Sequence, residues 1–220
     1  MIKSIVFDIG GVLAYDVWEY LLLDEESGVA AKYDLDREVV FKFARELWLK
    51  FECRPAHNSA EREAYEREYW ALFLERFRID LTIEDLIART DAFIRPVEGM
   101  RELLAQLKAR GHTLVICSDN NDFWFPRQAE KIGLDGLVDQ NRIILSQHIG
   151  ASKLSPNFEM FSAAVKAAQV DKTDCVLIDD RAKNIARAMQ FGLPSILFPA
   201  HADHYGAEYL RKLFERMDIL

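Results

Sequence analysis

Residues 5–13 constrain the fold of this chain more than any other stretch. They read Ile-Val-Phe-Asp-Ile-Gly-Gly-Val-Leu, an apolar run that reaches Asp8 and is soon followed by Gly10 and Gly11. A continuous apolar run is typical of a strand buried on both faces, as in a parallel sheet covered by helices. An aspartate at its end lies where open α/β sheets bind ligands, although an N-capping aspartate gives the same local pattern. The glycines allow a sharp turn and let backbone amides approach a ligand closely.

The second half of the chain repeats this strand pattern in alternation with helices. Four apolar runs predict strands, at 113–117, 143–145, 175–178 and 195–198. Four amphipathic segments predict helices, at 97–110, 125–132, 156–170 and 183–190. Alternating strands and helices predict an α/β fold, a parallel sheet joined by right-handed crossovers.

The segment that follows the first strand has a different pattern. From residue 16 to residue 90 there is almost no strand signal, and apolar residues recur at helical spacing, as in Val40, Phe43, Ala44 and Leu47. A block of this length is large enough for a small bundle with its own core. The sequence therefore predicts a helical insert at 16–90 and a core domain formed by residues 1–15 and 91–220.

Polar residues end several of the predicted strands. Asp8, Ser118 and the pair Asp179-Asp180 each follow an apolar run, and Lys153 lies in a loop before a helix. The carboxyl ends of parallel strands meet at one edge of a sheet, so these side chains are expected in one crevice. Carboxylates that share a site need a cation, and oxygen ligands suit Mg²⁺. Lysine and serine can then hold phosphate oxygens while one aspartate attacks phosphorus.

These residues stand in four motifs that resemble those of the haloacid dehalogenase superfamily. The motifs are residues 7–12, 116–120, 150–156 and 178–184. The resemblance covers essentially the whole chain, and four motifs in this order are far more specific than any one of them. It implies a Rossmann-like parallel sheet core with a mobile, all-helical cap inserted after the first strand.

The resemblance also implies a role for each motif. Asp8 would be the nucleophile, and Ser118 would bind the phosphoryl group. Lys153 would neutralise the negative charge of the nucleophile and of the phosphate. The implied catalytic residues are Asp8, Ser118 and Lys153; the phosphate-binding residues are Gly11, Ser118, Asp119, Asn120 and Lys153; the Mg²⁺ ligands are Asp8, Gly10, Asp179 and Asp180. Asp180 would bind the metal directly and Asp179 through water.

One position departs from the phosphatases of this superfamily. They usually carry a second aspartate two residues after the nucleophile, as general acid and base, and here that position is Gly10, as in some sugar-phosphatase-like members with an Asp-x-Gly first motif. The Gly10 carbonyl can still bind Mg²⁺, but the proton donor for the leaving group is missing, a contribution of typically about 10²–10⁴-fold. Asp16, Asp119 and His57 are candidates to replace it through a water, although each also fits a surface or capping role.

The expected function is that of a Mg²⁺-dependent phosphatase acting on a small phosphorylated metabolite, such as a sugar phosphate, through an aspartyl-phosphate. A 2-haloacid dehalogenase uses the same nucleophile and also lacks the second aspartate. By resemblance, however, it needs no metal and no acidic pair like Asp179-Asp180. A catalytically impaired binding protein is the third interpretation, which Gly10 supports and the intact Asp8 and Lys153 oppose.

The composition limits the partners of the chain. A net charge of -8 over 220 residues argues against a surface for nucleic acid or anionic membranes. Neither a spanning apolar run nor a basic leader is visible, and three scattered cysteines fit packed thiols in a reducing compartment. We expect a cytoplasmic monomer or homodimer. His201 and His204 fit solvent-facing or capping roles better than a metal site.

Overall fold

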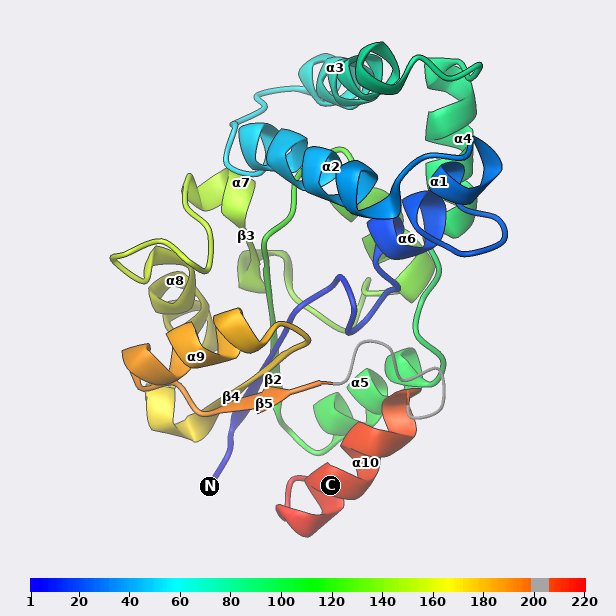
Figure 1. Ribbon diagram of the computed structural model, residues 1–220. Coiled ribbons are helices and arrows are strands. Elements are labelled where there is room, and N and C mark those ends of the chain that lie inside the picture. The colour runs from blue at the N-terminus through cyan, green and yellow to red at the C-terminus, as the bar shows by residue number, and fades with distance from the viewer. Residues whose placement is uncertain (199–205) are drawn as a thin grey trace.

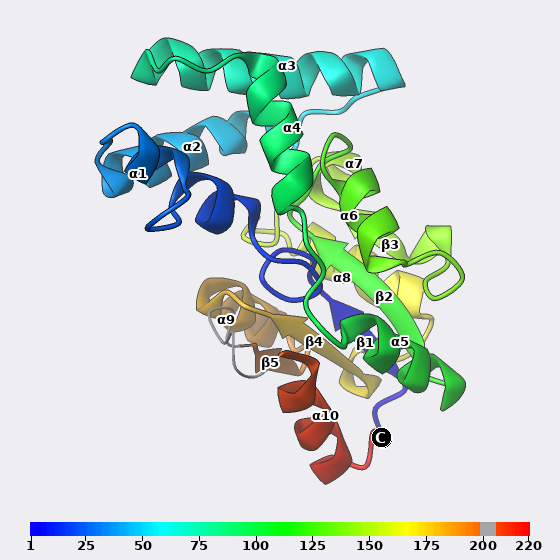
Figure 2. The same ribbon diagram turned by 90° about the vertical axis from the view of Figure 1, so that its right-hand side faces the viewer.

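The computed structural model describes residues 1–198 and 206–220 (Figures 1 and 2). Its centre is a sheet of five parallel strands in the order β3-β2-β1-β4-β5, so the first strand of the chain is the middle one. The strands are β1 (Ser4–Phe7), β2 (Thr113–Ser118), β3 (Ile143–Leu145), β4 (Cys175–Asp179) and β5 (Ser195–Leu197). Phe7 pairs with Ile116 on one side and with Ile178 on the other. The predicted α/β fold with a parallel sheet is confirmed.

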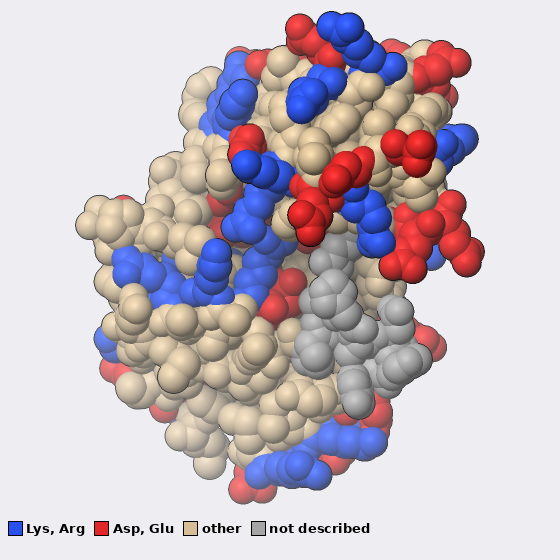
Figure 3. Space-filling model, viewed as in Figure 1, with Lys and Arg blue, Asp and Glu red and all other residues tan. Residues whose placement is uncertain are grey.

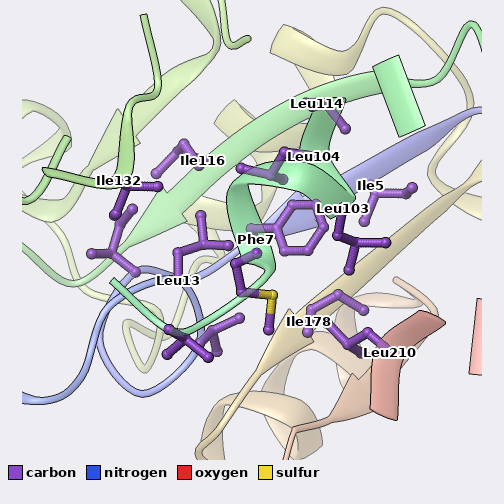
Figure 4. Close-up of a cluster of buried hydrophobic side chains, with 14 of the residues drawn as sticks. Ile5, Phe7, Leu13, Leu103, Leu104, Leu114, Ile116, Ile132, Ile178 and Leu210 are labelled. Atoms are coloured by element: carbon purple, nitrogen blue, oxygen red, sulfur yellow. The ribbon is translucent and has the colours of Figure 1, made fainter. Parts of the chain in front are cut away.

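Helices cover both faces of this sheet, as strands that are apolar on both sides require. Ile5 and Phe7 of β1 pack on one face with residues of α5, α6 and α10, and Figure 4 shows Phe7 among leucine and isoleucine side chains. Val6 packs on the opposite face with residues of α8 and α9. The core helices are α5 (Met100–Ala109), α6 (Phe125–Ile132), α7 (Ser146–Ile149), α8 (Glu159–Ala168), α9 (Ala182–Phe191) and α10 (Gly206–Arg216), with 3₁₀ turns at Gln140–Arg142 and Lys172–Asp174.

Two core helices begin three residues later than the sequence predicts. Helix α5 begins at Met100 because Gly99, just before it, adopts a left-handed backbone conformation with φ of 74°. Helix α8 begins at Glu159, and Phe158 before it has φ of 61°. A left-handed residue interrupts the run of helical dihedrals, so the helix can start only after it. Periodicity alone does not reveal such an interruption.

The segment between β1 and β2 is helical, as predicted. It contains a π-helical turn η1 (Trp18–Leu22) and the helices α1 (Val29–Lys32), α2 (Arg37–Phe51), α3 (Ser59–Phe77) and α4 (Ile83–Phe93). Side chains of Asp36, Asn58 and Thr82 cap the first turns of α2, α3 and α4 by accepting backbone N–H hydrogen bonds. In Figure 1 these helices lie above the sheet, around a hydrophobic cluster of their own. We call residues 16–90 the cap, limits that remain a prediction.

The connecting segments and several side-chain contacts join cap and core. The connecting segments lie side by side, since the N–H of Tyr15 donates to the carbonyl of Arg95 at 2.9 Å. Further along the chain, Phe123 and Trp124 of the core belong to the hydrophobic cluster of the cap. The Trp124 indole also donates to Oε1 of the buried Glu66 in α3, at 3.1 Å. The core therefore supplies part of the apolar interior of the cap.

Several smaller expectations can be checked against the fold. Cys117 and Cys175 are buried in β2 and β4 and, with Cys53, are free thiols. Within the described residues, no helix combines the length and apolar character needed to cross a membrane. His201 and His204 lie outside the described residues.

Candidate active site

Asp8 directly follows the central strand and is only 6% exposed. Its backbone N–H donates to the carbonyl of Ile178 at 3.0 Å and so continues the pairing with β4. Its Oδ1 accepts from the N–H of Ile9 at 2.7 Å, and the Ser118 hydroxyl at the end of β2 also hydrogen-bonds the carboxylate. Burial raises the pKa of Asp8 to about 6, although the Lys153 ammonium acts to lower it. The sheet thus fixes one carboxylate that is mostly ionised at neutral pH.

Lys153 is a buried ammonium between two carboxylates. Its Nζ lies 2.8 Å from Oδ2 of Asp8 and 2.6 Å from Oδ2 of Asp179, and neither Lys153 nor Asp179 is exposed. Burial disfavours the ammonium, but Asp179 and Asp8 outweigh that effect and hold the pKa of Lys153 well above its usual value. Asp179 is held in turn by the Asn184 amide and by the N–H of Arg181.

The neighbouring carboxylates fit a divalent cation. Asp8, Asp179 and Asp180 offer oxygens that all lie within 4.8 Å of one another. Lys153 contacts the first two, whereas Oδ1 of Asp180 is buried and has no hydrogen-bond partner among the described residues. Burial raises the pKa of Asp180 to about 8, and repulsion from Asp8 adds to the shift. A crowded oxygen cluster with an unsatisfied carboxylate suits a hard cation such as Mg²⁺.

The two glycines after Asp8 differ in what their positions require. Gly11 has φ of 73°, and a Cβ there would lie 2.5 Å from Oδ2 of Asp180, so only glycine fits. Gly10 has no left-handed φ, and a Cβ there would meet only Oδ2 of Asp16, at 3.8 Å. Among the described residues, position 10 therefore has room for a Cβ atom. Neither backbone strain nor a close contact at the Cβ excludes an aspartate there.

A cavity of about 320 Å³ lies between the strand ends and the cap. Its volume is at the lower end of the range for small-molecule sites. Three basic residues border it, Arg45 from the cap and Arg181 and Lys183 from the core. On the face shown in Figure 3, Lys and Arg side chains gather where cap and core meet. The lining also includes the carboxyls of Asp8, Asp16, Glu52 and Asp119, so an anionic ligand fits the cavity when a cation or protons offset these groups. Its lining includes, from the core, Asp8, Gly10, Ser118, Asp119, Asn120, Trp124 and Gln128, and, from the cap, Asp16, Trp18, Arg45, Trp48, Leu49 and Glu52.

The structure brings the predicted site residues to this cavity or to its edge. The phosphate-binding candidates Asp119 and Asn120 line it, but both side chains are already engaged. Oδ1 of Asp119 accepts from the N–H of Lys153 at 2.8 Å, and Nδ2 of Asn120 donates to Gln128 at 2.7 Å. Among the described residues, Lys153 and the acidic pair are not part of the lining; they reach the cavity through Asp8.

The three candidates for the missing proton donor have different environments in the structure. His57 is exposed and does not belong to the cavity lining. Asp16 lines the cavity, but its Oδ2 lies 3.1 Å from the Arg181 guanidinium and its Oδ1 accepts from the N–H of Trp18. Asp119 also lines the cavity and holds the Lys153 backbone. Each carboxylate therefore already has a structural partner.

Sequence reasoning missed Glu52, a carboxyl of the cap that lines the same cavity. Glu52 is 5% exposed and its Oε1 has no hydrogen-bond partner among the described residues. A signal was present, because Glu52 stands four residues after the buried Trp48 and so continues the apolar stripe of α2. An acid on an apolar stripe is uncommon and indicates a special environment. Arg45 of α2, seven residues before Glu52 and so on the same face of the helix, lines the cavity too and was missed as well.

The fold and the site together place a buried aspartate at the end of the central strand of a parallel sheet, in contact with a buried lysine. A family model for haloacid dehalogenase-like hydrolases matches residues 2–192. The chain belongs to this family, as the four motifs implied.

Individual relatives agree with this assignment. A glyceraldehyde 3-phosphate phosphatase from Pyrococcus abyssi is 28% identical over 108 residues, which are 49% of this chain and 44% of that protein. The chain therefore matches less than half the length of that relative. A HAD family enzyme from Bacteroides thetaiotaomicron, in complex with magnesium and inorganic phosphate, is similar with a TM-score of 0.64 at 19% identity, over 93% of this chain and 98% of that chain. An L-2-haloacid dehalogenase from Xanthobacter autotrophicus is similar with a TM-score of 0.64 at 18% identity, over 100% of this chain and 85% of that chain. At these identities the two structures show a shared fold.

Proposed function

We propose that this hydrolase is a Mg²⁺-dependent phosphatase that acts on a small phosphorylated metabolite through an aspartyl-phosphate. The observation that carries the proposal is the buried cluster of Asp8, Lys153 and the acidic pair at the edge of a cavity with a basic border. The cavity volume and the net charge of -8 favour a small anionic substrate over a nucleic acid.

The first step is attack of Asp8 on phosphorus. Lys153 favours the ionised form of Asp8, and burial leaves that carboxylate poorly hydrated, so it is reactive. An oxygen of Asp8 forms a bond to phosphorus while the bond between phosphorus and the leaving-group oxygen breaks. The leaving-group oxygen takes up a proton. Water then attacks the aspartyl-phosphate, which releases inorganic phosphate and restores Asp8. The Ser118 hydroxyl and the Lys153 ammonium are suited to bind phosphoryl oxygens during both steps.

Four groups are proposed to hold the metal. Asp8, the Gly10 carbonyl and Asp180 would bind Mg²⁺ directly, because Oδ1 of Asp180 lacks another partner among the residues that the structure describes. Asp179 would contact it through water, since its oxygens already accept from Lys153 and Asn184. Bound Mg²⁺ would offset the negative charge of the phosphoryl oxygens.

The test is a panel of phosphorylated metabolites with the wild type and Asp8→Asn, in Mg²⁺ and in EDTA. We expect wild type in Mg²⁺ to release phosphate from at least one ester, EDTA to abolish release, and Asp8→Asn to lose at least about 10³-fold, as removal of a nucleophile does. A parallel assay supplies 2-chloropropionate. Halide release without metal would favour the dehalogenase, and no reaction in either assay would favour the binding protein.

A further inference from the structure

We propose that Glu52, carried by the cap, is the general acid and base that takes the place of the aspartate missing at position 10. The inference rests on the proposed phosphatase function. It concerns a residue that stands outside the four motifs, in the insert between the first and the second.

Glu52 is placed firmly at the cavity by its backbone. It ends α2, with its N–H donating to the carbonyl of Trp48 at 2.9 Å. Its carbonyl accepts from the Ser146 hydroxyl at 3.0 Å, and the same hydroxyl accepts from the N–H of Asn120. Through Ser146 the end of α2 is therefore joined to the loop that follows β2. That loop also borders the cavity, through Asp119 and Asn120.

Glu52 differs from the other cavity carboxylates because, among the described residues, its buried Oε1 has no hydrogen-bond partner. Asp8 contacts Lys153, Asp16 contacts Arg181, and Asp119 holds a backbone N–H. Oε1 of Glu52 is buried and accepts no hydrogen bond from the described residues. A buried carboxylate without a partner is costly in its ionised form, whereas a protonated carboxyl can donate to a ligand oxygen.

Burial leaves Glu52 protonated for much of the population at neutral pH. Burial raises the pKa of Glu52 to about 7, and repulsion from Asp119 adds to that shift. Lys153, Arg181 and Arg45 act in the opposite direction. The Cys53 thiol beside it stays neutral, because burial raises its pKa to about 11. A pKa near the working pH is what efficient proton transfer in both directions requires.

In the proposed cycle Glu52 donates its proton to the leaving oxygen while Asp8 bonds to phosphorus and the ester P–O bond breaks. An alcohol leaves, and Glu52 is left as a carboxylate. That carboxylate then accepts a proton from the water that attacks the aspartyl-phosphate, so that phosphate and free Asp8 are formed and Glu52 is protonated again. Ester and water are consumed, alcohol and phosphate are produced, and no other reactant is needed.

The experiment compares wild type with Glu52→Gln on 4-nitrophenyl, phenyl and benzyl phosphate, whose leaving oxygens are increasingly basic. The measured quantity is kcat/KM, because it reports the steps up to departure of the leaving group. We expect Glu52→Gln to lower kcat/KM for benzyl phosphate by about 10²–10⁴-fold and for 4-nitrophenyl phosphate by less than about tenfold. Wild-type kcat/KM for benzyl phosphate should fall as pH rises through about 7, where Glu52 loses its proton, and Glu52→Gln should lack this fall.

Glu46→Gln is the matched control, since it makes the same change at an exposed position of the same helix. It should leave all three values of kcat/KM unchanged. Equal losses for the three esters in Glu52→Gln, or an unchanged pH profile, would mean that Glu52 only binds substrate or supports the fold.

The two proposals fail separately. If wild type releases no phosphate from any ester, the phosphatase function and the role of Glu52 both fall. If wild type is active and Glu52→Gln behaves like Glu46→Gln, only the role of Glu52 falls. If Glu52→Gln fails to fold, the turnover of benzyl phosphate is measured instead with Glu52→Ala and added formate. Recovery of benzyl phosphate turnover with rising formate supports the proposal, and no recovery overturns it.

Discussion

The core side and the cap side of the cavity are built in opposite ways. On the core side, a buried lysine pairs with two carboxylates, as Lys153 does with Asp8 and Asp179. On the cap side, Trp18 and Trp48 line the cavity beside Arg45 and Glu52, and Trp48 stacks on Trp124 of the core at a centroid distance of 4.8 Å. The core side therefore has paired charges that suit one reaction, while the cap side adds an acid with a pKa near neutrality and apolar surface that suit the choice of leaving group.

The largest expected effect comes from breaking the core side. Lys153→Met leaves Asp8 and Asp179 buried without their cation, and the loss of one partner of a buried pair costs about 3–5 kcal/mol. We expect the free energy of unfolding to fall by this amount in urea titrations with EDTA present, and turnover to be lost.

Lys3→Met is the matched control for that change. Lys3 Nζ lies 2.6 Å from Oδ2 of Asp174, the same distance as in the Lys153–Asp179 pair, but the Lys3 side chain is 61% exposed. An exposed pair contributes little, so Lys3→Met should barely change the unfolding free energy. If Lys3→Met and Lys153→Met lose equal stability, the core side does not depend on its buried charges as described.

The core side is also the part that the sequence predicts best, and the reason is local. Asp8, Ser118 and Asp179 each end an apolar run. The same few residues therefore predict both where the strand ends and which polar side chain lies at that end. A parallel sheet then brings separate strand ends to one edge without further information. The buried state of Lys153 needed the fold, because a lysine in a loop is usually exposed.

The cap side could be predicted only as a block of helices. The placing of Glu52 depends on where α2 ends and on its contact with Ser146, 94 residues away in the chain. The packing of Phe123 and Trp124 into the cap cluster is a contact between distant segments as well. Helical periodicity marks which face of a helix is buried, but not which neighbour covers it.

The next largest effect comes from giving the core side an acid of its own. Gly10→Asp adds a carboxyl at a position where, among the described residues, a Cβ meets only Oδ2 of Asp16, at 3.8 Å, so the backbone should accept the substitution. In a Glu52→Gln background, we expect Gly10→Asp to raise kcat/KM for benzyl phosphate by about tenfold or more, part of the usual contribution of a general acid.

Gly10→Asn in the same background distinguishes the effect of the acidic group from the effect of the size of the side chain. It has nearly the same shape but cannot donate an acidic proton, so it should give no gain. A thermal melt of each variant shows whether it is folded. A folded Gly10→Asp variant that gains no more than Gly10→Asn would indicate that position 10 does not face the leaving oxygen.

The smallest expected effect concerns the charge that the cap brings to the cavity. Arg45 borders the cavity from α2, and it is one of the charges that hold the pKa of Glu52 down against the larger effect of burial. Arg45→Ala should lower kcat/KM two- to five-fold for an anionic metabolite, about the contribution of a partly exposed charge pair. It should also move the alkaline fall of kcat/KM for benzyl phosphate to higher pH, because the pKa of Glu52 rises when this positive charge is removed.

Lys42→Ala removes the same charge from an exposed position of α2 that is not part of the cavity lining. Solvent and salt screen that charge, so its profile should match the wild type. Equal shifts in the two variants would show that the pKa of Glu52 responds to the total charge of the cap, whereas a shift confined to Arg45→Ala means that the cap sets this pKa from within the cavity.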